Sequence, residues 1–292
     1  MCARKKDMIY DADKWLKPYK DVIDRRHRMI METKERLSVN GSLSGGMNNH
    51  IHYGLHRDAR GNWVFREWAP NATKIYLIGD FNNWKRSDAY ALSPVGGGNW
   101  EISLPAMFLD HGTLYKLFIE WPGGGAERLP AYVTRTVQDP QTKQFCAQVW
   151  DPVKPYEWKN SKPGKRPHPL IYECHIGMAA EEEKVGTFEE FRQNVLPKIA
   201  DLGYDTIQIM ALQEHPYYGS FGYQVSNFFA LSSRFGTPEE FKALVDEAHG
   251  LGIAVVMDIV HSHSVDNEAE GLGLFDGKET LYFYDGWQGR HP

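Results

Sequence analysis

The sequence has few cysteines, no long apolar run and no excess of positive charge. Its three cysteines, Cys2, Cys146 and Cys174, lie far apart and form no CxxC pair, which argues against a disulfide framework or a cysteine-based zinc site. The chain has 33 Lys and Arg against 38 Asp and Glu, so no general cationic field attracts nucleic acid or anionic lipid. No stretch approaches the roughly 18 uncharged apolar residues of a membrane span. We therefore expect a cytoplasmic protein with neither nucleic acid nor membrane as a partner.

The chain is apolar enough to fold and is rich in aromatic residues. Of its 292 residues, 42% are hydrophobic and 24% are charged, which supports one or two hydrophobic cores and excludes disorder as the main state. It contains Trp 9, Tyr 15 and Phe 14. Aromatic rings bind weakly polar, flat ligands such as sugars, but they also fill β-rich cores, and composition alone favours the core.

The pattern of the N-terminal segment predicts a helix followed by a loop. Residues 14–37 place apolar side chains close to helical spacing, and Pro18 suits a first turn, so we predict one amphipathic helix there. Residues 38–49 are rich in Gly, Ser and Asn and have no period, which is typical of a loop. We assign 1–49 as an N-terminal helix and loop.

A hydrophobic period of two runs from about residue 50 to residue 150. Trp100, Ile102 and Leu104 show this alternation, and short alternating strands separated by turns predict a β-sandwich over 50–150. The next segment, 151–169, holds five prolines in nineteen residues. This composition favours an extended linker and marks a domain boundary.

Strands and helices alternate after the linker. Residues 170–176, 206–212 and 253–260 read as buried strands joined by two helical segments. Parallel strands with crossover helices begin either an open α/β sheet or a (β/α)₈ TIM barrel, which takes roughly 250 residues. We predict an α/β plus β protein in which 170–292 holds the first three strands of an incomplete barrel.

The two helical segments carry clear start and stop signals. Thr187 and Thr237 each precede a Glu by three residues, a spacing that predicts a capping box at the helix start. Pro197 should distort the first helix. Gly203 and Gly250 should end the first and second helix, respectively.

Polar residues gather where the second and third predicted strands end. The segment 213–224 is long enough to line a cleft and carries three tyrosines. Asp258 interrupts the third apolar strand, and His261 and His263 follow it. Because a carboxylate inside a buried strand needs partners, we favour a functional site here.

The two histidines allow other interpretations. One could cap a turn while the other is a hydrogen-bonded core residue. A His-x-His pair could also bind a metal ion, as in metal-dependent hydrolases. In those enzymes the pair usually leaves the first barrel strand, whereas here it leaves the third and follows a separate sandwich. We predict no metal site and no cofactor.

Several ordered motifs carry a family resemblance. The chain resembles the α-amylase superfamily and, within it, the eukaryotic-type 1,4-α-glucan (glycogen or starch) branching enzymes. Two of these motifs lie upstream. FREWAPNATKIYLIGDFNNW (65–84) is similar to the starch-binding-type module of these enzymes, and WLKPYKDVIDRRH (15–27) is similar to their N-terminal helix. The motifs in the predicted barrel are IYECHIGM (171–178), EHPYYGSFGYQVSNFFA (214–230), SRFGTPEEFKALVDEAHGLGI (233–253), MDIVHSH (257–263) and GLGLFDG (271–277).

The resemblance implies substrate-binding roles for three residues near the strand ends. Tyr223 matches a tyrosine whose ring stacks on the glucose at the cleaved bond. His263 matches a histidine that hydrogen-bonds this sugar. Asp258 matches an aspartate that organises the active-site base through buried hydrogen bonds.

The resemblance also implies a glucan surface on the module. Trp68, Pro70, Trp84 and Lys116 match its candidate residues, and Asn40 in the preceding loop is a further candidate. The alternative for Trp68 is a place in the sandwich core.

The implied chemistry is a retaining double displacement, in which an aspartate attacks the anomeric carbon and a glutamate protonates the leaving oxygen. The resemblance places the nucleophile after strand four, the acid/base after strand five and a further aspartate after strand seven. None of these strands is found in the 292 residues, so we predict no catalytic residue in this chain and no activity from it alone. Glu173 and Glu214 lie in the strand-one and strand-two motifs without a nucleophile pattern.

We therefore predict the N-terminal part of a branching enzyme whose partner is an α-1,4-glucan polymer such as glycogen, starch or amylose. The complete enzyme would cut an α-1,4 glucan and re-attach the piece through an α-1,6 bond. The alternatives are a non-catalytic glucan-binding scaffold and an amylolytic glycoside hydrolase of the same superfamily.

Overall fold

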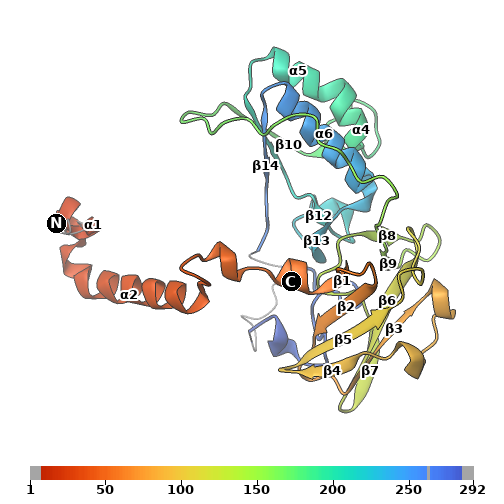
Figure 1. The fold of residues 1–292 in the computed structure, drawn as a ribbon. Helices are drawn as coiled ribbons and strands as arrows, with labels where there is room; N and C mark the ends of the chain where they lie inside the picture. Colours follow the sequence, from red (N-terminus) through yellow and green to blue (C-terminus); the bar gives the residue numbers. More distant parts are fainter. Residues whose placement is uncertain (1–7, 262–263, 285–292) are drawn as a thin grey trace. The chain divides into compact units, whose positions relative to one another are not determined.

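A computed structural model describes residues 8–261 and 264–284 of the chain (Figure 1). The chain divides into two compact units, Met1–Ile51 and His52–Pro292.

The first unit is helical. It contains α1 (Ile9–Ala12), the 3₁₀ turn η1 (Lys14–Tyr19), α2 (Lys20–Leu37), a second 3₁₀ turn η2 (Ser44–Gly46) and the start of α3 (Asn49–His52). The predicted helix over 14–37 is thus confirmed from Lys20 onward. Its first six residues form η1, which contains Pro18 and is capped by the Asp13 carboxylate accepting from the Trp15 amide. Pro18 has no N–H to donate, which explains why the α-helix begins only after it.

The second unit begins with a β-sandwich of two antiparallel sheets (Figure 1). One sheet has the order β1 (Gly54–Arg57), β2 (Trp63–Trp68), β5 (Asn99–Leu104) and β4 (Ser93–Gly96). The other has the order β3 (Lys74–Gly79), β6 (Leu114–Trp121), β9 (Phe145–Gln148) and β8 (Thr136–Gln138), with β7 (Gly124–Arg128) paired to β6; the turns η3 (Asp80–Asn82) and η4 (Asp88–Tyr90) follow β3.

The alternation seen in the sequence builds the core between these two sheets. Phe65 pairs across the first sheet with Ile102, and Leu77 pairs across the second with Leu117. Phe65, Leu77 and Leu117 are fully buried in one apolar cluster. The predicted sandwich is confirmed, because side chains of period two from both sheets meet in one core.

A three-stranded parallel sheet follows, in the order β10 (Ile171–Cys174), β11 (Thr206–Ile209) and β14 (Ala254–Met257). Its helices are α4 (Phe188–Glu190), the π-helix η6 (Phe191–Val195), α5 (Leu196–Asp201) and α6 (Pro238–Gly250), and the short turn η5 (Ile176–Met178) follows β10. Figure 1 shows α4, α5 and α6 grouped beside these strands. Phe188, Ile207 and Leu244 are fully buried in the core between helices and strands.

Both predicted capping boxes are present. Thr187 and Thr237 each accept a hydrogen bond from the amide of the Glu three residues later, whose carboxylate accepts from the Thr amide. The distortion expected at Pro197 takes the form of the π-helix η6 just before α5, where the proline amide is missing. Gly203 adopts the expected left-handed conformation, with φ +83°.

Two sequence predictions in this region are wrong. Gly250 is the last residue of α6 and not its cap; Leu251 is the C-cap, and Gly252 takes the left-handed position with φ +76°. Asp258 does not interrupt a strand, because β14 ends at Met257. The Asp258 amide still donates to the Ile209 carbonyl at 3.0 Å, the last ladder bond before the chain leaves the sheet.

A small antiparallel hairpin, β12 (Gln213–Glu214) and β13 (Asn227–Leu231), lies between the parallel strands and the sandwich (Figure 1). The 3₁₀ turn η7 (Tyr218–Ser220) lies in its loop, and η8 (Ser233–Phe235) follows β13.

The segment that ends with the 3₁₀ turn η9 (Glu279–Leu281) packs against the sandwich. Phe275 is fully buried in the sandwich core, and a Cβ on Gly277 would stand 2.4 Å from the Trp121 ring. The sequence shows no period here, because irregular backbone places its apolar side chains at irregular spacing.

Candidate functional site

The loop between β12 and β13 carries Tyr223 and makes a sharp turn just before it. Phe221 and Gly222 have φ values of +53° and +83°. A Cβ on Gly222 would lie 2.5 Å from both the Cβ and the carbonyl oxygen of Ala211. Only glycine fits this close approach, and the turn directs the chain so that Tyr223 follows at the ends of the parallel strands.

Tyr223 and Asp258 come together at the carboxyl ends of the parallel strands. Burial is the main cause of a raised pKa of Tyr223, followed by the negative charges of Asp258 and Glu173 and by a hydrogen bond with Asp258. Parallel α/β architectures place functional groups at this edge. The structure therefore brings together two of the three predicted substrate-binding residues, while His263 lies outside the described residues.

Two buried histidines that the sequence analysis did not select lie near this edge. His175 follows β10, and its ring meets the rings of Tyr218, Phe221 and Phe235 edge-on. The pKa values of His175 and His215 are both lowered, chiefly by burial. In the sequence, each of these histidines follows an apolar strand motif, and this was the only signal that could have identified it. Neither histidine lies at a spacing from other residues that is typical of a functional motif.

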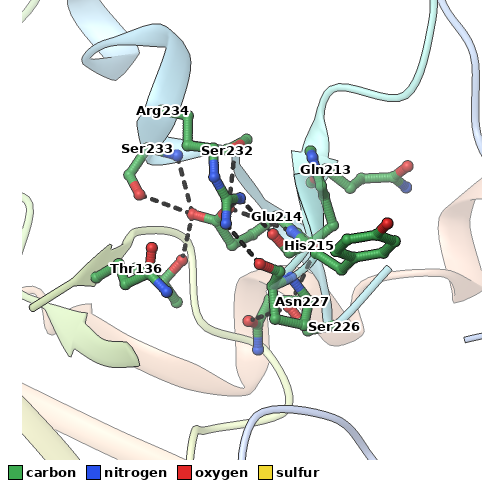
Figure 2. Close-up of polar contacts among 12 residues, drawn as sticks. Thr136, Gln213, Glu214, His215, Ser226, Asn227, Ser232, Ser233 and Arg234 are labelled. Atoms are coloured by element: carbon green, nitrogen blue, oxygen red, sulfur yellow. Dashed lines mark hydrogen bonds and ion pairs between the residues drawn. The ribbon is translucent and has the colours of Figure 1, made fainter. Parts of the chain in front are cut away.

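Glu214 is fully buried and forms the centre of a polar network (Figure 2). Its Oε2 accepts from Thr136 Oγ1 at 3.0 Å and from the amide and hydroxyl of Ser233, both at 2.9 Å. Its Oε1 accepts from Ser232 Oγ at 2.9 Å and lies 3.6 Å from Arg234 Nη1. Every close partner is a donor, so this carboxylate holds the surrounding structure together.

A cavity of about 280 Å³ opens beside Trp68 at the end of β2. Its lining includes the exposed Pro70 together with Asp276 and Lys278. The Trp68 indole is half-buried, donates to the Gly97 carbonyl at 3.1 Å and meets the Tyr282 ring edge-on. Trp68 is not part of the sandwich core cluster, so the core alternative for this residue is not realised.

Neither Trp84 nor Lys116 lines the cavity beside Trp68. Trp84 follows β3 and its indole donates to Asp80 Oδ1 at 3.2 Å, while Lys116 lies on β6 in the other sheet. Lys116 is 9% exposed, and its ammonium bonds Glu127 at 3.2 Å. Asn40 is an exposed turn residue of the first unit, with φ +51°. The glucan roles of these three residues stay predictions.

Glu67 lies next to Trp68 in the chain and is fully buried. Its two carboxylate oxygens accept from the amides of Trp68 at 2.9 Å and Ala131 at 3.0 Å. Burial outweighs these bonds and raises the pKa of Glu67 to about 7 from its ordinary value of 4.5.

This raised pKa of Glu67 predicts a pH-dependent stability. Between pH 4.5 and 7 the folded chain binds more protons than the unfolded chain at this carboxyl, so raising the pH through this range removes stability. The free energy of unfolding of wild type minus that of Glu67→Gln should fall by about 3 kcal/mol from pH 4.5 to 7.5. Urea titrations of both proteins at several pH values measure this difference; a constant difference would contradict the prediction.

Other site classes can be addressed only within the described part of the chain. Across residues 8–261 and 264–284, no three His, Cys, Asp or Glu side chains are grouped so that they could hold a metal ion. Among the helices that the structure describes, none is long and apolar enough to cross a membrane.

Two protein families match parts of the chain. Residues 52–140 match carbohydrate-binding module 48, the isoamylase N-terminal domain. Residues 180–273 match the α-amylase catalytic domain. The first match covers most of the sandwich, and the second begins after β10 and includes Tyr223 and Asp258.

Curated relatives match almost the whole chain. Proteins named 1,4-α-glucan-branching enzyme from Rhizophagus irregularis and Aspergillus oryzae are each 42% identical over 97% of this chain. The enzyme of the same name from Dictyostelium discoideum is 40% identical over 97%. The chain spans 42% of the length of each of these relatives.

Solved structures show the same fold. The structure of an α-amylase candidate from Salmonella typhimurium is 26% identical in sequence, with a TM-score of 0.66. The match covers 81% of this chain and 38% of that chain. A pullulanase from Bacillus acidopullulyticus is 16% identical with a TM-score of 0.66, over 82% of this chain and 33% of its own. At this identity the second likeness concerns the fold alone.

Proposed function

We propose that this chain belongs to the family of 1,4-α-glucan-branching enzymes. In this proposal its sandwich binds α-1,4-glucan polymers such as glycogen, starch or amylose, and the part that follows supplies the first part of that family's catalytic domain. The observation that carries this proposal is the meeting of Tyr223 and Asp258 at the carboxyl ends of β11 and β14, in a region that matches the α-amylase catalytic domain. An aromatic ring beside a carboxylate suits a sugar, because the ring packs on the apolar face of the pyranose while the carboxylate accepts hydrogen bonds from hydroxyls.

We infer that β10, β11 and β14 are the first three strands of a (β/α)₈ barrel. Their order follows the chain, and the crossover helices lie between them. Among the described residues, no strand pairs with the outer edge of β14, where Val256 is 43% and Met257 is 40% exposed. A further parallel strand would cover these apolar side chains.

For the complete protein we propose transfer and not hydrolysis of glucan chains. The curated relatives reported above carry the branching-enzyme name and align over 97% of this chain. In this proposal the complete enzyme cuts an α-1,4 bond and re-attaches the chain through an α-1,6 bond. A cytoplasmic location belongs to the same proposal and rests on composition alone.

The sandwich should bind glucan through the cavity beside Trp68. An indole that packs on a glucose ring contributes roughly 0.5–1.5 kcal/mol, so Trp68→Ala should weaken binding about 2- to 10-fold. Native gel electrophoresis of the 292-residue chain through gels containing glycogen measures this as a loss of retardation.

The matched control is Trp158→Ala, which removes an indole that is 54% exposed and lies away from the cavity, near His249 of α6. This variant should be retarded like wild type. Equal retardation of all three proteins would argue against the cavity, and an absence of retardation for wild type would argue against the proposed glucan binding itself.

A further inference from the structure

Hydrogen bonds hold both ends of the loop that carries Tyr223, residues 215–226. The amide and the hydroxyl of Ser226 donate to the Glu214 carbonyl oxygen at 2.9 Å and 3.1 Å. At the start of the loop, Arg234 donates to the carbonyl oxygens of His215 and Pro216, the latter at 2.6 Å. The start and end of the loop are thus held by Glu214 and Arg234.

The Glu214 side chain ties this loop to the sandwich. Thr136 belongs to β8, and its hydroxyl donates to Glu214 Oε2 across 78 residues of sequence. The same oxygen accepts two bonds from Ser233 of η8, which directly precedes Arg234. One buried carboxylate therefore joins three elements, namely β8, β12 and η8 (Figure 2).

The strand on the far side of the loop also contacts the sandwich. Phe229 of β13 stacks on Tyr132 with ring centres 4.8 Å apart, and Tyr132 stacks on Tyr53 at 5.1 Å. Arg135, next to Thr136, donates to the Gly236 carbonyl at 2.7 Å. The β12–β13 hairpin is thus fastened to the sandwich along both of its strands.

We infer that Glu214, through its bond to Thr136, is a positioning residue by which the sandwich holds the Tyr223 loop at the ends of the parallel strands. The importance of this position for glucan rests on the proposed function; the coupling itself does not. In this account the sandwich has a second role besides binding polymer, because it completes the support of the substrate-binding loop.

The energetic basis is the cost of leaving a buried carboxylate short of a donor. Glu214 has no exposed surface, so water cannot replace the Thr136 hydroxyl without local opening. Removing one hydrogen bond to a charged group weakens a local structure enough to speed its opening by about 10-fold or more. The opening should concentrate in the segment that Glu214 and Arg234 close, which is 215–226.

The test uses the 292-residue chain with 3-fluorotyrosine placed at position 223. Thr136→Val keeps the side-chain shape and removes the donor, whereas Thr136→Ser keeps the donor. We expect the fluorine signal of Thr136→Val to move toward its position in urea and to broaden, and amide exchange in 215–226 to rise by about 10-fold or more, while α6 keeps its protection. Thr136→Ser should restore the wild-type signal and exchange rate.

The matched control is Asp246→Asn on α6. Asp246 is another buried carboxylate, and it accepts hydrogen bonds from the Tyr156 hydroxyl and from the amides of Lys159 and Asn160. Its variant should speed exchange around 156–160 and leave the fluorine signal at 223 unchanged. If Thr136→Val does not fold, Thr136→Ala, which also removes the donor to Glu214 Oε2, provides the same comparison.

Two outcomes would overturn the inference. One is an unchanged fluorine signal and unchanged exchange in the loop of a folded variant. The other is an equal rise of exchange in the loop and in α6, which would assign Glu214 to general stability. Neither readout involves glucan, so this test stays separate from the Trp68 experiment.

Discussion

The 292-residue chain is expected to form no α-1,6 branches when it is incubated with amylose. The resemblance places the nucleophile and the acid/base after the fourth and fifth barrel strands, whereas the described part of the chain contains three parallel strands. Losses for catalytic residues that act as a unit reach roughly a million-fold. Glu214 cannot substitute for them, because both of its oxygens already accept hydrogen bonds from buried donors.

The measurement is the iodine spectrum of amylose after incubation, checked with a debranching enzyme. A positive control is a chimera in which this chain replaces the matching 42% of the Aspergillus oryzae relative. The chimera should shift the spectrum, and the shift should disappear after debranching. A debranching-sensitive shift with the 292-residue chain alone would contradict the assignment of the catalytic pair to later strands.

Replacing Tyr223 by Ala in that chimera is expected to lower the branching rate about 100-fold or more. A ring against the sugar and hydrogen bonds that tighten as the sugar approaches an oxocarbenium ion stabilise the transition state by a few kcal/mol. The structure supports a close fit, because Gly222 packs on Ala211 and leaves the backbone before Tyr223 little freedom. Initial branching rates at saturating amylose give the comparison, with kcat expected to change more than KM.

Tyr217→Ala is the matched control for this substitution. Tyr217 lies in the same loop, but its side chain is 64% exposed, so its removal should leave the rate within about twofold of the unmodified chimera. A Tyr223→Ala chimera that kept more than half of the branching rate would remove Tyr223 from the proposed site. A loss of similar size in both variants would point to the loop as a whole and not to the Tyr223 ring.

The features that the sequence predicted correctly depend on interactions over a few residues or on a simple period. The capping boxes at Thr187 and Thr237 are made between residues three apart, so their spacing is visible in the chain. The alternation of Trp100, Ile102 and Leu104 repeats every two residues, as a strand with one buried face requires. Strand and helix bounds were less accurate, as at Asp258 and Gly250, because the last ladder bond or cap depends on a neighbouring element.

The sequence by itself therefore determined a β-sandwich, the beginning of an α/β domain and, through its motifs, the resemblance to 1,4-α-glucan-branching enzymes. Only the tertiary structure decided which polar residues act together. Glu214 meets Thr136 across 78 residues, and Asn71 donates to the Asp276 carbonyl across 205 residues at 2.8 Å beside the Trp68 cavity. No local period records such pairs, because the free energy that selects them is the desolvation of buried polar groups, which depends on what the fold places around them.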